Sequence, residues 1–343
     1  MCSLAEASFR RSTLELSFYE STVETRSLNS RERMYDSNKC VKKYRRSAAG
    51  GVKRFDGDVR SYNDLMITLE YLCSLMVFES NCFYNVEEFV QDRIRGVNVE
   101  LVQERIRGGE VLRKGYRMSV FSGYVLTGHK NYVQKFNEEQ KGRCLNMLMD
   151  VDEGDEVMSF RGLTMLKEYV FTGKRGDVEG IVKGSFEGKG KVKFVIDLGE
   201  AWEEGNYRRF LKLITEADPS DPWTYLMRFI MLQCLGNVRM TILKCSNKAY
   251  GKGEKVLGEE MARLLFMKDG ETAIKFAEEA GLSISEDRRH VVMKVQPVLE
   301  DKNLECRRDD DFVFGDLKDE ILGGEDVDKV RLLKPEFVQW LLH

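Results

Sequence analysis

The sparse use of proline constrains the fold of this chain more than any other feature. Only four prolines occur in 343 residues, so long stretches carry no residue that breaks a helix. Leu, Met, Glu, Lys and Arg, which all favour helices, dominate the sequence. We therefore expect a mostly α-helical chain, long enough for one large domain or two joined domains.

Composition excludes several protein classes. Hydrophobic residues make up 42% of the chain and charged residues 32%, which fits a soluble protein with a sizeable core. No run of about 18 apolar residues occurs, so we expect neither a transmembrane helix nor membrane insertion. The first six residues lack the basic segment and apolar core of a secretory signal.

The eight cysteines are scattered along the chain. No two are separated by two residues, so neither a zinc knuckle nor a redox pair is expected. Several occupy apolar helical positions, which predicts reduced, buried thiols in a cytosolic or nuclear compartment. We expect no metal and no cofactor.

Helical periodicity is clearest after Ser61, a good N-cap with Asp64 at the third position. Apolar residues then recur at helical spacing from Tyr62 to Met76. Further helices are predicted over 86–107, 109–127, 137–150, 156–172, 191–203, 205–216 and 221–236. Such a succession favours an α-solenoid of paired, tetratricopeptide-like helices, although no exact repeat recurs at a fixed period.

The character of the sequence changes at Val238. A helix over 238–250 is predicted to precede a short strand at 255–257 and helices over 258–266 and 270–280. A β-hairpin is then predicted from residues 282–285 and 291–295. Helix, strand, helix, helix and hairpin is the order of a winged helix.

These patterns divide the chain into four parts. Residues 1–35 are predicted to form an extended arm packed on the body, and residues 36–237 a helical-repeat domain. Residues 238–300 are predicted to form the winged helix, and residues 301–343 an acidic tail with a short final helix. The fold class expected is all-α with a small β-hairpin: an α-solenoid followed by a C-terminal winged helix.

Several short motifs, in one order along the chain, resemble those of the SAC3/GANP family. They are Arg46-Ser47-Ala48-Ala49-Gly50; Asp58-Val59-Arg60 with the helix that follows; Phe89 to Arg95, which includes Asp92, Arg93 and Arg95; Asn137-Glu138-Glu139-Gln140; and Gly205-Asn206-Tyr207 followed by Phe210. The family pattern that normally follows Arg95 is degraded here to the residues Asn98–Gln103. The resemblance covers roughly residues 35–300.

This resemblance implies a fold and a set of partners. Family members look like helical-repeat scaffolds capped by a winged helix, the PCI architecture, and serve the TREX-two complex. Such a scaffold pairs with a second PCI protein through the winged helices, and a small acidic peptide of the Sem-one/DSS-one type clips the partner. The pair presents a basic surface to RNA or to single- or double-stranded DNA, in the nucleus and in association with nuclear pore components. Shuttling to the cytoplasm is compatible with this role.

The densest basic cluster is a candidate phosphate-binding site. It comprises Lys42, Lys43, Arg45, Arg46, Lys53 and Arg54. A local cluster can bind phosphate groups even though the whole chain has a net charge of -3. The alternative is a solvated loop, or charge that docks on acidic helices. Arg46 in particular can be structural, because the Ala and Gly beside it suggest close packing.

The predicted winged helix offers a second basic surface. Lys275 lies on its predicted recognition helix, Arg288 and Arg289 on the wing, and Lys294 behind the wing. Such modules can place a helix or wing against nucleic acid. PCI-type winged helices more often mediate dimerisation, here through a strand edge, and the two roles can coexist. For Asp92 to Arg95 we favour a structural role, in which the charges pair with a neighbouring helix.

Enzymatic function is not expected. His129, His290 and His343 are isolated from metal-ligand or triad motifs, and the glycine-lysine segments lack the phosphate-binding Walker frame. The sequence thus predicts a non-enzymatic nuclear scaffold of messenger-RNA export, with no small-molecule substrate. The alternative is a PCI subunit of another assembly: the splicing- or elongation-linked branch of the same family, the proteasome lid or translation initiation factor three.

Overall fold

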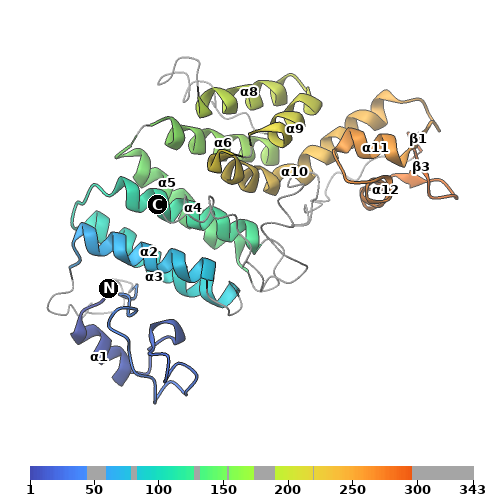
Figure 1. The fold of residues 1–343 in the computed structure, drawn as a ribbon. Coiled ribbons are helices and arrows are strands. Elements are labelled where there is room, and N and C mark those ends of the chain that lie inside the picture. Colours follow the sequence, from blue (N-terminus) through green and yellow to red (C-terminus); the bar gives the residue numbers. More distant parts are fainter. Residues whose placement is uncertain are drawn as a thin grey trace. The chain divides into compact units, whose positions relative to one another are not determined.

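The computed structural model describes residues 1–44, 59–78, 83–126, 132–152, 154–173, 190–218 and 220–295 (Figure 1). Outside these ranges lie the predicted acidic tail with its final helix, the basic residues Arg45, Arg46, Lys53 and Arg54, and the motif residues Ser47, Ala48, Ala49 and Gly50. The described chain forms two compact units. The first contains residues 1–119 and 135–152, and the second contains residues 120–134 and 153–295.

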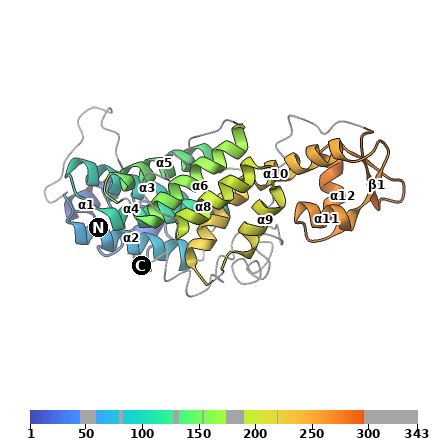
Figure 2. The same ribbon diagram turned by 90° about the horizontal axis from the view of Figure 1, so that it is seen from above.

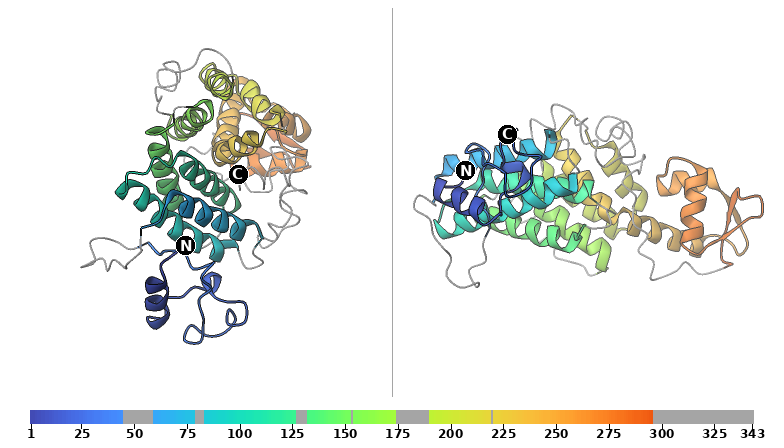
Figure 3. Two further views of the ribbon diagram at one scale, coloured as in Figure 1. Left: turned by 60° about the vertical axis from the view of Figure 1, so that its left-hand side comes forward. Right: turned by 90° about the horizontal axis from the view of Figure 1, so that it is seen from below.

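The N-terminal segment, residues 1–44, is not the extended arm that we expected. Leu4–Ser12 form helix α1, which begins where the Ser3 hydroxyl accepts a hydrogen bond from the Glu6 amide (3.2 Å). A 3-10 turn follows at Phe18–Glu20. The segment lies beside the longer helices of the first unit (Figure 3). There the Tyr71 hydroxyl donates to the Tyr19 carbonyl (2.5 Å).

Four longer helices complete the first unit, and the second of them ends earlier than predicted. They are α2 (Tyr62–Phe78), α3 (Phe83–Gln103), α4 (Gly109–Val125), which continues into the second unit, and α5 (Gln134–Met149). The capping box predicted before α2 is present, since Ser61 and Asp64 exchange backbone-to-side-chain hydrogen bonds of 3.2 Å. Helix α3 does not reach residue 107, because Arg105 adopts a left-handed backbone conformation (φ 53°).

The second unit is built around one long helix. Helices α6 (Asp155–Thr172), α8 (Lys191–Glu203) and α9 (Tyr207–Glu216) pack in succession, and α6 and α9 also contact α10 (Pro222–Ala249) (Figure 2). We expected two helices, over 221–236 and 238–250, where α10 is continuous. Gly236 does not break it, because this glycine is buried in the core and its neighbours supply the packing.

Helix α10 begins as predicted, with the Asp221 side chain accepting from the Trp223 amide (2.9 Å) and Pro222 in the first turn. Within the described ranges, α10 is the one helix long and apolar enough, by length and composition, to cross a membrane. However, 83% of its apolar window is buried inside the protein. The same pattern is typical of the core helix of a soluble protein.

The C-terminal end of α10 carries a small α/β module, residues 250–295, which we call the terminal module. Its elements are β1 (Lys255–Leu257), α11 (Gly258–Leu265), α12 (Gly270–Glu279), β2 (Ser283–Ile284) and β3 (His290–Val292). The strands form an antiparallel sheet in the order β1-β3-β2. The element order is the one we predicted, and the all-α fold class with a small β-hairpin is confirmed.

Candidate interaction surfaces

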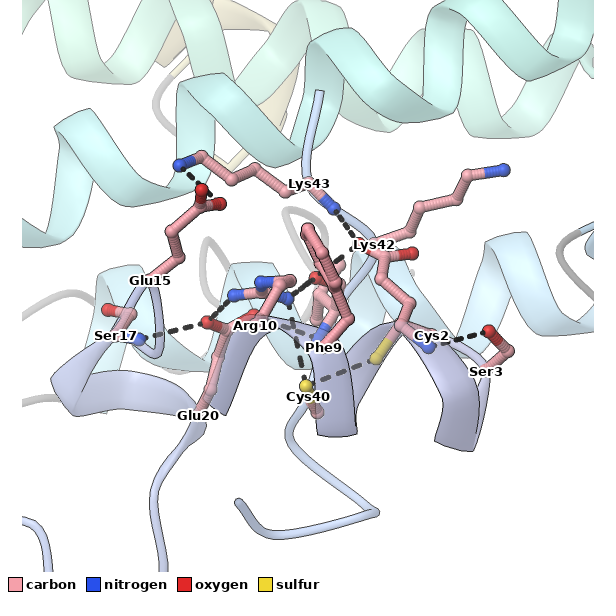
Figure 4. A network of polar contacts seen from close by, with 12 residues as sticks. Cys2, Ser3, Phe9, Arg10, Glu15, Ser17, Glu20, Cys40, Lys42 and Lys43 are labelled. Carbon is pink, nitrogen blue, oxygen red and sulfur yellow. Dashed lines mark hydrogen bonds and ion pairs between the residues drawn. The ribbon is translucent and has the colours of Figure 1, made fainter. Parts of the chain in front are cut away.

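A buried ion cluster joins the N-terminal segment to α3, and Figure 4 shows two of its members, Arg10 and Glu20. The Glu20 carboxylate pairs with two guanidinium groups, those of Arg10 on α1 and Arg93 on α3, the latter at 3.2 Å. The three side chains are 0–4% exposed. We call these three residues the N-terminal clasp. Because a buried charge is stable only when it is paired, the clasp holds the segment in one position on α3.

Glu20 controls the ionisation of the clasp. Burial alone would lower the pKa of the Arg10 guanidinium, but the Glu20 carboxylate beside it raises that pKa above its usual value. Arg10 therefore stays protonated. Its Nη1 atom also donates to the Val41 carbonyl (2.9 Å), which links α1 to the end of the segment.

A second buried carboxylate fixes the end of the segment. Glu100 on α3 pairs with the Lys42 ammonium group and, at 2.7 Å, with the Arg60 guanidinium group, which is 5% exposed. The backbone at Lys42 runs directly over Gly96 of α3. A Cβ atom at Gly96 would lie 3.4 Å from the Lys42 carbonyl oxygen, at the short limit of ordinary van der Waals contact. The segment and α3 are thus in direct backbone contact at this position.

Two lysines that the sequence predicted to bind phosphate, Lys42 and Lys43, are paired with acidic groups in the structure. Lys42 is paired with Glu100, and Lys43 pairs at 3.4 Å with Glu15, while its amide donates to the Glu6 carboxylate (3.1 Å). Lys42 thus docks the segment on an acidic group of α3, which agrees with the alternative that the sequence left open, whereas Lys43 contacts acidic groups inside the segment itself. Of these two, Lys43 is the more exposed.

The family motif from Asp92 to Arg95 lies on α3, and its residue Arg93 helps to hold the N-terminal segment on that helix. We expected the charges of this motif to pair with a neighbouring helix, but Arg93 pairs with Glu20 of the N-terminal segment and with the adjacent Asp92. Arg95 lies over the ring of Phe136 on α5, 3.5 Å from its centroid. The structural role favoured for this motif is therefore supported, although the partner of Arg93 differs from the prediction.

Sequence reasoning missed the residues that make these attachments. Arg10, Glu20 and Glu100 were not singled out as functional or structural residues, and Arg60 was named only as part of a family motif. A local signal existed for Glu20, because Ser17-Phe18-Tyr19-Glu20 is a capping-box pattern and the box is formed. That pattern could not show that the same carboxylate reaches Arg93, which lies 73 residues away in the sequence.

Glu87 on α3 makes the stability of the first unit depend on pH. Its side chain is 6% exposed, and burial, reinforced by the nearby Glu88 carboxylate, raises its pKa from 4.5 to about 7. The folded protein thus binds this proton more tightly than the unfolded chain. The stability that this difference contributes is present below pH 4.5 and is lost as the pH rises through about 7.

Replacing Glu87 by Gln should remove this dependence. We expect Glu87→Gln to stabilise the protein by about 2 kcal/mol more at pH 8 than at pH 5, since the variant has no charge to bury. Urea unfolding at the two pH values measures the difference. Glu104→Gln, which alters an exposed carboxylate just after the same helix that does not act on Glu87, is the matched control. An equal effect of Glu87→Gln at both pH values would contradict the assignment.

The cations predicted on the terminal module differ in their surroundings. Arg288 pairs with Glu278 (2.7 Å), and Lys275 shares the exposed face of α12 with Glu271, Glu278 and Glu279. The surface around these two cations is therefore close to neutral or acidic. Arg289 and Lys294 are exposed, and neither pairs with an acidic side chain in the described part of the chain.

Lys294 belongs to a wider basic area. Its amide donates to the Asn247 side chain near the end of α10 (2.7 Å), and the Gly253 amide donates to the Met293 carbonyl (2.9 Å). These bonds bring together three exposed stretches that carry lysines. We call this area the basic sheet end; its members are Lys248, Lys252, Lys255 and Lys294.

The sheet of the terminal module ends in an open strand edge. In an antiparallel pair, the residues whose backbone groups bond to the partner strand alternate with residues whose groups point away. The Met293 amide donates to the Glu254 carbonyl and the Gly258 amide to the Arg289 carbonyl (both 2.9 Å). With the register Val256↔Val291, both backbone groups of Lys255 and the amide of Leu257 therefore point outward. No described strand covers this edge, and Leu257 is 45% exposed.

Comparison with known proteins agrees with the motifs. No curated protein matches the chain. The model of the SAC3/GANP family matches residues 1–286, which include the N-terminal clasp, all of the described helices and most of the terminal module. The match thus begins well before the region in which we recognised the motifs. Since it covers most of the sequence, the chain belongs to the SAC3/GANP family.

Proposed function

We propose that this protein is a non-enzymatic scaffold subunit of a nuclear messenger-RNA export complex, and that its terminal module binds a second winged-helix protein of the PCI type. Membership of the SAC3/GANP family gives the chain a role in export scaffolding at the level of the family. The open edge of β1 is the observation that carries the finer proposal.

The β1 edge can bind a partner in a defined way. The outward amide groups of Lys255 and Leu257 and the Lys255 carbonyl are available to pair with a strand of the partner. The Leu257 carbonyl is at the N-cap of α11 and accepts the first hydrogen bond of that helix. The apolar Leu257 side chain is exposed beside these groups and adds a contact that excludes water. A strand edge that is left open also favours aggregation, so a subunit with such an edge benefits from a constant partner.

Contact with nucleic acid is a second part of the proposal. The basic sheet end and Arg289 supply exposed cations, whereas α12 carries three exposed glutamates around Lys275. Phosphate contact is therefore favoured at the sheet end and at the wing residue Arg289 rather than at α12. The acidic peptide of the Sem-one/DSS-one type is assigned to the partner, as the family resemblance implies.

Another assembly could use the same fold. A proteasome-lid or initiation-factor subunit of the PCI type would also present a winged helix with an open strand edge. Family membership favours the export machinery over these alternatives, because the family match includes the N-terminal segment as well as the helical body. A place at the nuclear pore and shuttling to the cytoplasm belong to the proposal as well.

Affinity capture of the intact chain from nuclear extract, followed by mass spectrometry, tests this proposal. We expect a second PCI-type winged-helix protein and a small acidic peptide in equal amounts with the captured chain. Recovery of proteasome-lid or initiation-factor subunits in their place would assign the chain to another assembly. Recovery of no stable partner would contradict the scaffold role itself.

A further inference from the structure

Two thiols that are 38 residues apart in the sequence face each other in the N-terminal segment (Figure 4). The sulfur atoms of Cys2 and Cys40 lie 3.1 Å apart, and both residues are free cysteines. The Cys2 amide also donates to the Cys40 carbonyl (2.8 Å), which holds the two stretches of backbone beside each other. Because a disulfide needs a sulfur separation of about 2 Å, closure requires a movement of only about 1 Å.

We propose that Cys2 and Cys40 form a reversible disulfide when the protein meets a hydroperoxide, and that this bond fastens the N-terminal segment. The thiol pair is close to both sites of attachment described above. Arg10 of the clasp contacts Cys40, and Lys42, two residues further along, pairs with Glu100. The disulfide would join the start of the segment covalently to the stretch that carries these contacts.

The two thiols have different roles in the reaction. Cys2 is partly exposed, and its hydrogen bond with the Cys40 thiol lowers the pKa of Cys2, so Cys2 is the thiol that reacts first. Its thiolate attacks one oxygen of the hydroperoxide, and the alcohol or water leaves after taking up a proton. The product is the sulfenic acid of Cys2.

Cys40 completes the reaction. It is 1% exposed, so a hydroperoxide in solution has little access to it, but its sulfur is already in contact with that of Cys2. The Arg10 guanidinium lies 3.7 Å from the Cys40 sulfur and stabilises the thiolate as it forms. Attack on the sulfenic sulfur releases water. In balance, two thiols and one hydroperoxide give one disulfide, one alcohol and one water, or two waters from hydrogen peroxide.

The sequence could not reveal this pair. The spacing contains no short cysteine motif, and only the fold of the N-terminal segment brings the two residues together. In a reducing compartment both thiols stay reduced, so the bond forms only under oxidation and is reversed by thiol reductants. The proposal does not depend on the role in messenger-RNA export.

Peptide mapping of the intact chain tests the proposal. The reduced protein is titrated with hydrogen peroxide, blocked with N-ethylmaleimide and digested without reduction. We expect a peptide that links Cys2 to Cys40, lost again after treatment with dithiothreitol. Recovery of both residues as alkylated thiols, at a peroxide dose that oxidises the exposed Cys245, would overturn the proposal. A link between two copies of the chain would overturn it as well.

Variants separate the two roles. Cys40→Ser should leave Cys2 as a sulfenic acid that dimedone traps, whereas Cys245→Ser should still form the link. The oxidised wild-type protein should show a rise in Tm of roughly 3–5 °C that Cys40→Ser does not show. An unchanged Tm despite complete formation of the link would overturn the fastening role. The peptide map of the wild-type chain remains decisive if Cys40→Ser does not fold.

Discussion

Replacing Glu20 by Ala is expected to destabilise the attachment of the N-terminal segment by about 3–5 kcal/mol. The change removes the carboxylate that pairs with both Arg10 and Arg93, which are 0% and 4% exposed. The two buried guanidinium groups then lose the carboxylate that they share. Arg10 keeps only Glu6 at 4.0 Å and Arg93 only the adjacent Asp92, so the segment opens to hydrate them. Amide hydrogen exchange of α1 measures the loss as faster exchange at residues of Leu4–Ser12.

Glu15→Ala is the matched control for this prediction. Glu15 lies in the same segment and also pairs with a cation, Lys43 at 3.4 Å, but both side chains are more than a third exposed. Exposed pairs of this kind contribute little, so exchange in α1 should stay close to that of the wild type. If Glu20→Ala behaved like Glu15→Ala, the clasp would not be what holds the segment on α3.

Replacing Arg239 by Met is expected to destabilise the terminal module by about 3 kcal/mol. Arg239 is 2% exposed on α10, and its guanidinium group donates to the carbonyls of Leu265 (2.8 Å) and Phe266. Phe266 ends α11 in a left-handed conformation (φ 53°), a conformation that is unfavourable for a bulky side chain without such support. Hydrogen exchange over β1 and α11 should therefore accelerate.

Arg263→Met is the control that tests whether faster hydrogen exchange is specific to loss of the buried Arg239. Arg263 lies on α11 itself, but it is exposed and its guanidinium group donates only to the Glu259 carbonyl within the same helix (3.3 Å). We expect exchange in the module to remain close to that of the wild type. Comparable acceleration by both variants would mean that Arg239 has no special part in joining the module to α10.

The helices of the body could be predicted from the sequence because their signals are local. The apolar spacing after Ser61, the capping box with Asp64 and the Asp221-Pro222 start of α10 each involve residues within about one helical turn. The terminal module was predictable for the same reason. Its short strands and helices follow one another with a turn between them, and the pairing of β1 with β3 required only the order of elements.

Two errors came from giving local signals too much weight. We expected one helix to end at residue 236 and another to begin at 238, but the extensive burial of α10 stabilises the continuous helix more than Gly236 weakens it. The N-terminal segment read as extended because its polar, serine-rich sequence resembles a loop. Its helix α1 buries Glu6, Ala7 and Arg10, and the pairing of Arg10 with Glu20 depends on the tertiary fold.

The candidate surfaces were only partly accessible to sequence reasoning. Clusters of lysine and arginine are visible in any sequence, but their partners are not. Lys42 is paired with Glu100 and Arg288 with Glu278, whereas Lys294 belongs to the basic sheet end. The contact between Cys2 and Cys40 and the outward direction of the Leu257 amide likewise exist only in the folded chain.

Pairing through the β1 edge is the central claim, and a proline at residue 257 tests it most directly. The φ of Leu257 is -59°, a value that proline also adopts, and its amide points away from β3. Leu257→Pro therefore removes an outward donor and leaves the sheet intact. Leu257→Ala keeps that donor and removes only the side chain.

The measurement is the amount of the second PCI-type protein that co-purifies with wild-type, Leu257→Ala and Leu257→Pro chains from the same nuclear extract. Hydrogen exchange of the terminal module should first show that both variants are folded. We predict that Leu257→Pro recovers at least about tenfold less partner than Leu257→Ala, because strand pairing needs the amide. Equal recovery by the proline and alanine variants would contradict pairing through the β1 edge.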